Sequence, residues 1–78
     1  MKITITLELP QGGQACDIQV SNTQKIADTL QVLRDNSIMF KNLKDIKIVR
    51  EKESGRKIST ENTYEQVHIY SGAALILE

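Results

Sequence analysis

The chain has 78 residues and a formal net charge of zero at pH 7. A chain of this length forms one domain, so most of its hydrophobic residues, 40% of the sequence, must share a single core. A neutral chain has no bulk attraction to nucleic acid or anionic lipid. Cys16 is the one cysteine, which excludes an internal disulfide, and with the one histidine, His68, it cannot supply the about four ligands of a structural zinc site.

Apolar stretches in the sequence are short. The longest, residues 73–77, falls below the roughly 7–15 residues of a signal peptide and far below the roughly 20 that span a bilayer. The sequence therefore predicts a soluble, cytoplasmic protein in a reducing compartment, with no membrane insertion.

Two strands joined by a turn open the chain. Residues 3–9 alternate between apolar and polar types and include β-branched residues, which predicts a half-buried strand. Residues 10–13, Pro-Gln-Gly-Gly, predict a hairpin turn because glycine adopts positive φ angles. Cys16, Ile18 and Val20 then alternate with polar residues and predict a second strand with its apolar side chains on one face.

After the second strand, the spacing of the apolar residues changes from every second residue to that of a helix. This spacing predicts a helix over residues 23–34, which ends at the polar residues 35–37. Ser21 with Gln24 fits a capping box, and Thr23 is an equally good start. The apolar residues recur at spacings of four and three, on one helical face: Ile26, Leu30 and Leu33.

Residues between Ile38 and Leu43 are mostly apolar but have no clear period. Two interpretations stay open. The segment is either a loop that closes the core or an exposed apolar patch for a partner.

A second hairpin is predicted further along. Residues 46–49 begin a third strand, Ser54 and Gly55 form the turn, and residues 56–59 return as a short strand.

The last third of the chain has weaker periodicity. Tyr64, Val67 and Ile69 are expected to anchor it in the core, and residues 71–72 form a turn. Residues 73–77 are almost continuously apolar, which predicts a final strand in the centre of the sheet.

These elements predict an α+β protein with a β-grasp fold, formed by one domain over residues 1–78. One helix covers one face of a mixed sheet, and the helix carries the chain back across the sheet in the favoured hand.

The order and spacing of these elements resemble ubiquitin over nearly the whole chain, from the strand at residues 1–7 to the strand at 73–77. Ubiquitin, its conjugating relatives and the bacterial sulfur carriers of this fold end in a flexible Gly-Gly whose carboxylate is adenylated. This sequence ends at Glu78, and its Gly-Gly lies at residues 12–13, in the predicted hairpin. The departure argues against conjugation and sulfur transfer.

Among relatives without such a tail, the chain resembles the YukD-like (EsaB-like) family in residues 1–9 and 75–78. These are small bacterial ubiquitin-like proteins associated with type VII secretion in Gram-positive bacteria. The resemblance implies a non-conjugated accessory or adaptor protein that binds another protein, such as a component of the secretion system. The alternatives are a modifier or sulfur carrier that works without Gly-Gly or after processing, and a module cut from a larger protein.

Residues that could carry a reaction are few. His68 has no carboxylate pair beside it, with Glu65 the nearest acid, and Cys16 shares its parity with inward-facing residues. The glycines at 12–13 lack the lysine and hydroxyl residues of a phosphate loop and precede a strand. We therefore expect that the protein is not an enzyme and has neither catalytic residues nor a cofactor. Cys16 is expected to be buried and unreactive.

Basic residues concentrate in residues 41–57, where seven bases oppose three acids and give a net charge of +4. The rest of the chain carries −4. A charged hairpin that protects an edge strand explains this pattern, and a protein-docking surface is the alternative. Nucleic acid is disfavoured because no aromatic residues interleave with the bases.

A docking surface also follows from strand parity. If the isoleucines of residues 46–49 point inward, Lys47 and Val49 point outward, and Ile76 points outward between two leucines. The resemblance implies docking on this uncovered sheet face, with Arg50 adding positive charge. The predicted protein-binding residues are Lys47, Val49, Arg50 and Ile76, although isolated exposed apolar residues are also ordinary. The oligomeric state is open.

Overall fold

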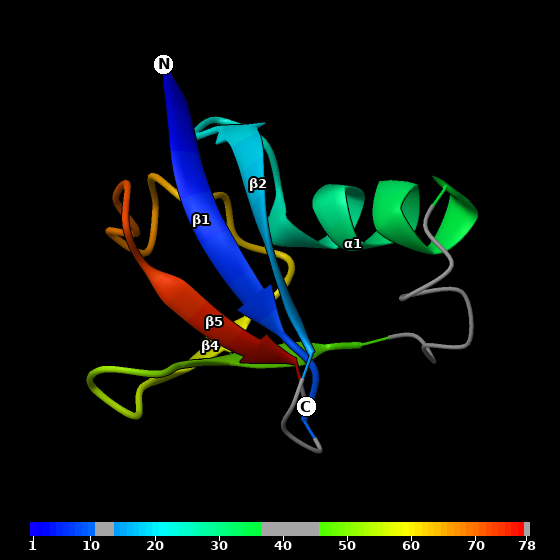
Figure 1. Ribbon diagram of the computed structural model, residues 1–78. Helices are drawn as coiled ribbons and strands as arrows, with labels where there is room; N and C mark the ends of the chain where they lie inside the picture. The colour runs from blue at the N-terminus through cyan, green and yellow to red at the C-terminus, as the bar shows by residue number, and fades with distance from the viewer. Residues whose placement is uncertain (11–13, 37–45, 78) are drawn as a thin grey trace.

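Five strands and one helix make up the part of the chain that the computed structural model describes, residues 1–10, 14–36 and 46–77 (Figure 1). The predicted elements are all present, with shifted ends. Their bounds are β1 Lys2–Glu8, β2 Ala15–Ser21, α1 Ile26–Asn36, β3 Ile48–Glu51, β4 Lys57–Ser59 and β5 Ala74–Leu77.

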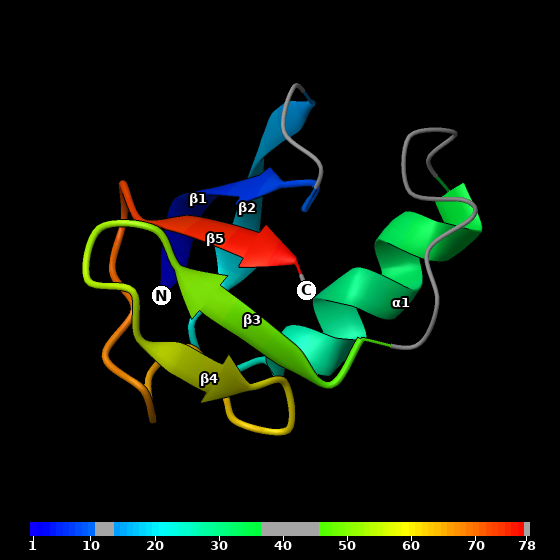
Figure 2. The same ribbon diagram turned by 90° about the horizontal axis from the view of Figure 1, so that it is seen from below.

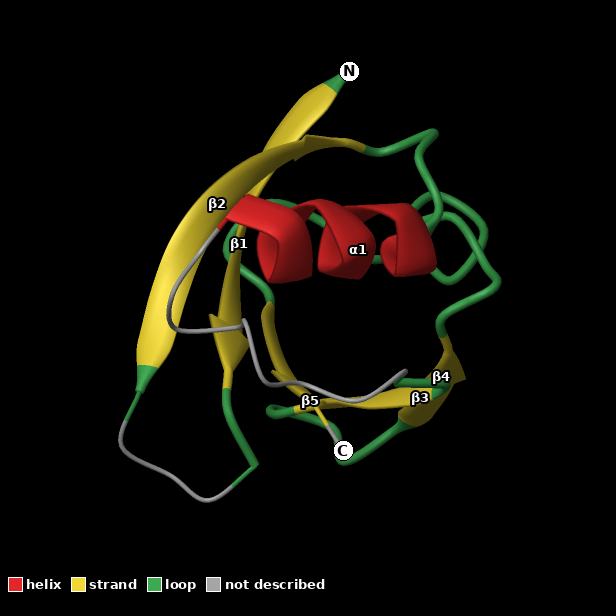
Figure 3. Cartoon of the chain, turned by 90° about the vertical axis from the view of Figure 1, so that its right-hand side faces the viewer, coloured by secondary structure: helices red, strands yellow, loops and turns green. Residues whose placement is uncertain are grey.

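The strands form a mixed sheet in the order β2-β1-β5-β3-β4. β5 pairs in parallel with β1 and antiparallel with β3, so the last strand lies in the centre, as Figure 2 shows. Helix α1 covers one face, and the sheet curls around it (Figure 3). The predicted β-grasp fold and the central position of the last strand are confirmed.

The register of the β1–β2 hairpin determines which side chains of these two strands face the helix. The Leu9 N–H donates to the Gln14 carbonyl at 3.0 Å, which fixes the register next to the turn. Three apolar pairs face each other across this ladder, on the side of the helix: Ile3 with Val20, Ile5 with Ile18, and Leu7 with Cys16. The predicted apolar face of β2 is therefore confirmed.

One hydrophobic core lies between the sheet and α1. The predicted anchors Tyr64 and Ile69 are fully buried, and Val67 packs against the core from a partly buried position. The buried apolar residues are Ile3, Ile5, Leu7, Val20, Ile26, Leu30, Val49, Ile58, Tyr64, Ile69, Leu75 and Leu77.

The helix begins three residues later than residue 23. The first N–H groups of a helix have no partner within the helix. Here the Ile26 N–H donates to the Asn62 carbonyl at 3.0 Å, and the Ala27 N–H donates to the Thr60 carbonyl at 2.8 Å. A tertiary contact with a distant turn thus fixes the start, which local capping preferences could not indicate.

The predicted parity of the third strand is wrong. Val49 is fully buried, whereas Ile48 is 38% exposed on the opposite face. The strand begins at Ile48, because Thr60 holds the segment before it: its hydroxyl donates to the Ile46 carbonyl at 3.0 Å, and its N–H donates to the Lys47 carbonyl at 2.9 Å. Ile46 packs against the core from outside the strand, so its parity does not carry over to Ile48.

Two predicted turns are confirmed by glycines with positive φ, a conformation that glycine adopts without steric cost. Gly55 has φ 76° in the β3–β4 hairpin, where its N–H donates to the Glu51 carbonyl at 2.8 Å. Gly72 has φ 94° before β5, and its N–H donates to the Thr4 carbonyl at 2.8 Å. The predicted turn at residues 10–13 and the segment from Ile38 to Leu43 lie wholly or partly outside the described residues.

Buried polar groups pair across the core. The Tyr64 hydroxyl donates to the Thr29 hydroxyl oxygen at 2.9 Å, and the Gln24 amide donates to the same oxygen at 3.0 Å. Burial is the main cause that raises the pKa of Tyr64 to about 12, against a smaller opposing effect of the Thr29 contact.

Stability is therefore expected to fall at alkaline pH. The Tyr64 proton is held more tightly in the folded state, so this contribution is complete below pH 10 and is lost as the pH rises to about 12. The loss amounts to about 3 kcal/mol. Urea unfolding between pH 9 and pH 11.5 measures the part of this loss that is expected by pH 11.5, about 2 kcal/mol. Tyr64→Phe is the control, and an equally steep decline in that variant would contradict the assignment.

Within the described residues, no helix is long and apolar enough to cross a membrane.

Candidate protein-binding face

Helix α1 leaves the other side of the sheet uncovered (Figure 3). We call this side the outer face. Strand alternation places the following side chains on it: Thr4, Thr6 and Glu8 of β1, Asp17 and Gln19 of β2, Ile48 and Arg50 of β3, Lys57 of β4, and Ala74 and Ile76 of β5.

Ile76 lies in the centre of the outer face. The registers place Glu8 beside it on β1 and Arg50 beside it on β3, and Lys57 follows on β4. This row crosses four strands and puts a half-buried isoleucine between an acidic and a basic side chain. An apolar centre with a charged surround is the usual composition of a protein contact.

Ile48 adds a second apolar side chain to this face. It is 38% exposed and lies two residues from Arg50 on the same strand. Because Arg50 is the register partner of Ile76, Ile48 is a diagonal neighbour of Ile76, at about 7–8 Å between backbones. The two isoleucines therefore form one apolar patch with Arg50 at its edge.

Of the four residues predicted to bind a partner, two lie as predicted. Arg50 is exposed, and Ile76 is half-buried on the outer face. Lys47 is exposed but precedes β3. The prediction for Val49 is wrong, since its side chain has no exposed area and lies in the core.

Ile48 was missed because the parity was taken from Ile46. Neighbouring residues in a strand point to opposite faces, so Val49 and Arg50 cannot both point outward. The charge of Arg50 was the better signal, because a charged side chain is rarely buried without a partner. With Arg50 outward, Ile48 is outward too.

Charge on the outer face is partly compensated. Lys52 Nζ lies 3.0 Å from a carboxylate oxygen of Glu8, in an exposed ion pair that reaches across β5. Arg56 ties the β3–β4 hairpin to the segment that contains Val67. Its guanidinium donates to the Val67 carbonyl at 2.8 Å and lies 3.5 Å from a carboxylate oxygen of Glu51. The predicted basic segment thus contributes Arg50 and Lys57 to the face itself.

His68 is exposed and lines a groove of about 230 Å³. It has a positive φ of 59°, which is uncommon outside glycine, and the Tyr70 hydroxyl is 3.5 Å from its Nδ1. Among the described residues, no group of three His, Cys, Asp or Glu side chains could hold a metal ion.

Cys16 shares the inner face of β2 with Ile18 and Val20, as predicted, but it is half-buried instead of fully buried. Its position next to the hairpin turn leaves part of the side chain uncovered. Burial raises the pKa of the thiol, and the negative charge of Asp17 raises it further.

Folded protein should therefore react slowly with a thiol reagent at pH 7.5, because the thiolate is the reacting form. The rate should be lower than that of the same protein in denaturant and should rise steeply with pH. Asp17→Asn should increase the rate in the folded protein by removing the neighbouring charge. Equal rates for native and denatured protein would contradict both the burial and the pKa shift.

Comparisons with known proteins bear on the fold. No protein-family model matches the sequence, and no curated protein matches it either. Solved structures match closely in shape. The ubiquitin of Caldiarchaeum subterraneum is 17% identical, with a TM-score of 0.70 over 99% of this chain and 91% of that one. The fold is ubiquitin-like.

Two further structures agree. A de novo protein designed on ubiquitin is 18% identical, with a TM-score of 0.73 over 99% of this chain and 87% of the designed one. The C-terminal ubiquitin-like domain of mouse tubulin-specific chaperone E is 13% identical, with a TM-score of 0.72 over 97% of this chain and 84% of that one. Likeness at these identities shows the fold alone, so the role of this ubiquitin-like chain must be argued from its own surface.

Proposed function

We propose that this ubiquitin-like chain is a non-enzymatic adaptor that binds a protein partner through its outer face. The observation that carries the proposal is the patch of Ile48 and Ile76 beside Arg50 on an uncovered sheet. Apolar side chains at the centre of a polar surface supply binding energy when a partner removes them from water.

The partner is expected to present an apolar centre with an acidic rim. Arg50 and Lys57 lie on the same register row as Ile76, so an acidic group opposite them would meet complementary charge. Complementary rim charges mainly accelerate association. Added salt should therefore slow association more than it changes dissociation.

The biological setting that we propose is bacterial type VII secretion, with the chain acting in the cytoplasm as an accessory protein of the YukD-like kind. The support is the resemblance of residues 1–9 and 75–78 to that family. A neighbouring gene for a membrane ATPase, together with genes for small helical secreted substrates, would strengthen this assignment. A gene neighbourhood without either would weigh against it, while leaving the binding face testable.

A pull-down from the native cytosol, followed by titration with the identified partner, tests the outer face. Ile76→Asp and Ile48→Asp should each weaken binding at least about tenfold, because each replaces an apolar contact with a carboxylate that must lose its water in the interface and that repels the acidic rim expected of the partner. Gln31→Asp is the matched control, since Gln31 is exposed on α1 and receives the same side chain.

Circular dichroism should show all three variants folded. If both isoleucine variants are folded and bind the same partner as tightly as the wild type, the outer face is not the binding site. The segment from Ile38 to Leu43 would then be the next candidate.

A ubiquitin-like modifier or sulfur carrier is the alternative function. Activation of that kind needs an extended C-terminal carboxylate, and a tail carrying it would have to follow β5, in which Leu75 and Leu77 are fully buried. Intact mass of the protein isolated from its host separates the two functions. A covalent adduct through the C-terminal carboxylate would support the modifier and contradict the adaptor.

A further inference from the structure

The two edges of the sheet differ in protection. β4 has three residues and carries Lys57, and short, charged edge strands resist pairing with another chain. β2 has seven residues, with no proline and no lysine, and lies at the opposite edge. In the part of the chain that the structure describes, no strand lies beyond it.

At every second residue of β2, the backbone N–H and carbonyl point away from β1, toward the open edge of the sheet. In an antiparallel ladder, directly opposite residues alternate between pairs that exchange hydrogen bonds and pairs that do not. The bond from the Leu9 N–H to Gln14 and the bond from the Asn22 N–H to Met1 fix this alternation, so even-numbered residues of β2 bond to β1. Ala15, Asp17, Gln19 and Ser21 therefore direct their backbone groups to the open edge.

Most of these groups have no other backbone partner in the described structure. The Ser21 carbonyl accepts from the Gln24 N–H at 3.1 Å, so it is already engaged. Asp17 and Gln19, in the middle of the strand, present both an N–H and a carbonyl. They form the part of the edge that is best able to accept another strand.

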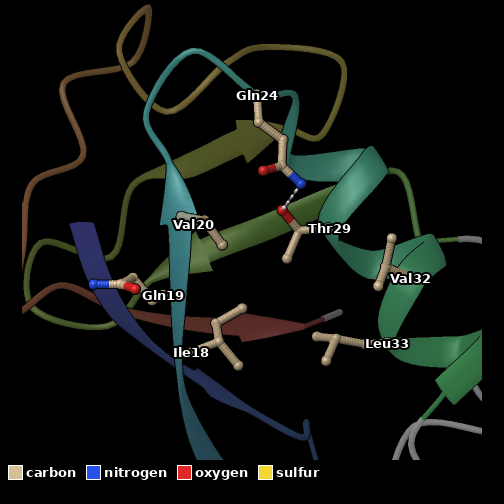
Figure 4. Close-up of a pocket in the computed structure, with 7 residues that line it drawn as sticks. All are labelled: Ile18, Gln19, Val20, Gln24, Thr29, Val32 and Leu33. Carbon is tan, nitrogen blue, oxygen red and sulfur yellow. Dashed lines mark hydrogen bonds between the residues drawn. The ribbon is translucent and has the colours of Figure 1, made fainter. Parts of the chain in front are cut away.

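An apolar groove of about 230 Å³ lies next to this edge, between β2 and α1. Figure 4 shows Ile18 and Leu33 pointing toward the groove from opposite sides, with Val32 beside Leu33. Val32 is 56% exposed, although it is a large apolar residue. The open edge and the exposed apolar surface thus occur at the same place.

We propose that a second copy of this chain occupies the site, with the two β2 strands paired antiparallel across a two-fold axis at Ile18. Residue 18 is the midpoint of Ala15–Ser21, so this register overlaps all seven residues of both strands. The two sheets then join into one, and the outer face of each copy stays open for the function proposed above.

The side chains fit this register. Ile18 meets Ile18 of the second copy, and Cys16 meets Val20, so the groove side of the joint is entirely apolar. Asp17 meets Gln19 of the second copy, twice by symmetry, and the two residues exchange the backbone bonds that both lack. No two like charges face each other, because Asp17 is the only charged residue of β2.

Neighbouring registers fit less well. A two-fold axis at Asp17 would place two carboxylates directly opposite each other, which destabilises a strand pair. An axis at Gln19 would leave two residues at one end of each strand without a partner from β2. The register at Ile18 is the one that combines full overlap with charge compatibility. The exposed Val32 of both copies then covers the joint from the helix side.

Two opposite charge substitutions at one position test the dimer. Sedimentation equilibrium of the wild type should show a reversible monomer–dimer equilibrium at protein concentrations between about 10 µM and 1 mM. Gln19→Asp faces Asp17 of the second copy at two symmetric positions and should weaken dimerisation roughly 2- to 30-fold. Gln19→Lys faces the same carboxylates and should strengthen it by a similar factor, with both effects reduced by salt.

Cross-linking tests the register. In a Cys16→Ser background, Ile18→Cys should give a disulfide-linked dimer on oxidation. Its symmetric partner lies directly opposite at about 4.5 Å between Cα atoms, within disulfide range. Gln19→Cys is the control, since its symmetric copy is displaced along the strand and should cross-link far less.

Three results would overturn the proposal. The first is a wild-type chain that stays monomeric at about 1 mM. The second is a dimer that responds in the same direction to both substitutions of Gln19, measured on variants that circular dichroism shows to be folded. The third is cross-linking through Gln19→Cys that equals cross-linking through Ile18→Cys. A chain that stays monomeric and instead binds an extended peptide of another protein at β2 would also overturn the proposal, because the occupant would then not be a second copy.

Discussion

Val49→Asp is expected to unfold the protein, whereas Ile48→Asp leaves it folded. Val49 has no exposed area and packs in the hydrophobic core between the sheet and α1. An unpaired carboxylate there costs several kcal/mol, either as desolvation or as forced protonation. A domain of this size has a total stability of about 4–12 kcal/mol, so the substitution removes most or all of it.

The neighbouring residue provides the control. Ile48 is 38% exposed on the outer face, where a new carboxylate stays in water. We expect Ile48→Asp to change stability by about 1 kcal/mol or less, mostly through lower strand propensity. Far-ultraviolet circular dichroism with urea unfolding distinguishes the two variants. A folded Val49→Asp beside an unfolded Ile48→Asp would mean that the parity of β3 is reversed.

Strands with a strict alternation could be predicted from the sequence. β1 alternates over its whole length and β2 alternates from Cys16 onward, and a one-residue error would have moved every apolar side chain to the solvent face. The inner positions of Ile3, Ile5 and Leu7 are accordingly as predicted. The central position of β5 was also predicted, from its almost continuous apolar run, although Ala74 and Ile76 lie on the uncovered face of the sheet.

Elements fixed by distant backbone groups could not be predicted in detail. The start of α1 depends on the carbonyls of Thr60 and Asn62, which lie more than 30 residues away in the sequence. The parity of β3 depends on Thr60 as well, through its bonds to the two residues before the strand. Thr60 has a polar side chain in a stretch without period, so nothing local marks it as buried.

The candidate site also has a part that could be predicted from the sequence and a part that could not. Ile76 follows from strand alternation and Arg50 was predicted for its charge, while Val49 was placed on the wrong face and Ile48 was missed. The groove beside β2 needed the structure, because it joins residues of a strand to residues of a helix. Helical periodicity placed Leu33 on the apolar face but gave no reason for the exposed Val32.

Leu30→Ala is the second substitution with a large expected effect. Leu30 is 5% exposed and lies on the face of α1 that packs into the core. Truncating a buried leucine removes its transfer free energy and leaves a cavity, at a cost of about 2–5 kcal/mol. In a domain with about 4–12 kcal/mol in total, this loss lowers the melting temperature by at least about 8 °C.

Gln31→Ala separates this packing effect from helix propensity. Gln31 follows directly in the same helix but is exposed, and alanine is at least as good a helix former as glutamine. We expect a change below about 0.5 kcal/mol. Urea unfolding of both variants at one pH measures the difference. An unchanged slope of the unfolding free energy against urea concentration would show that the shifted midpoint reports a change in stability. Equal costs for the two substitutions would mean that α1 does not bury the face containing Leu30, and the core between sheet and helix would have to be reassigned.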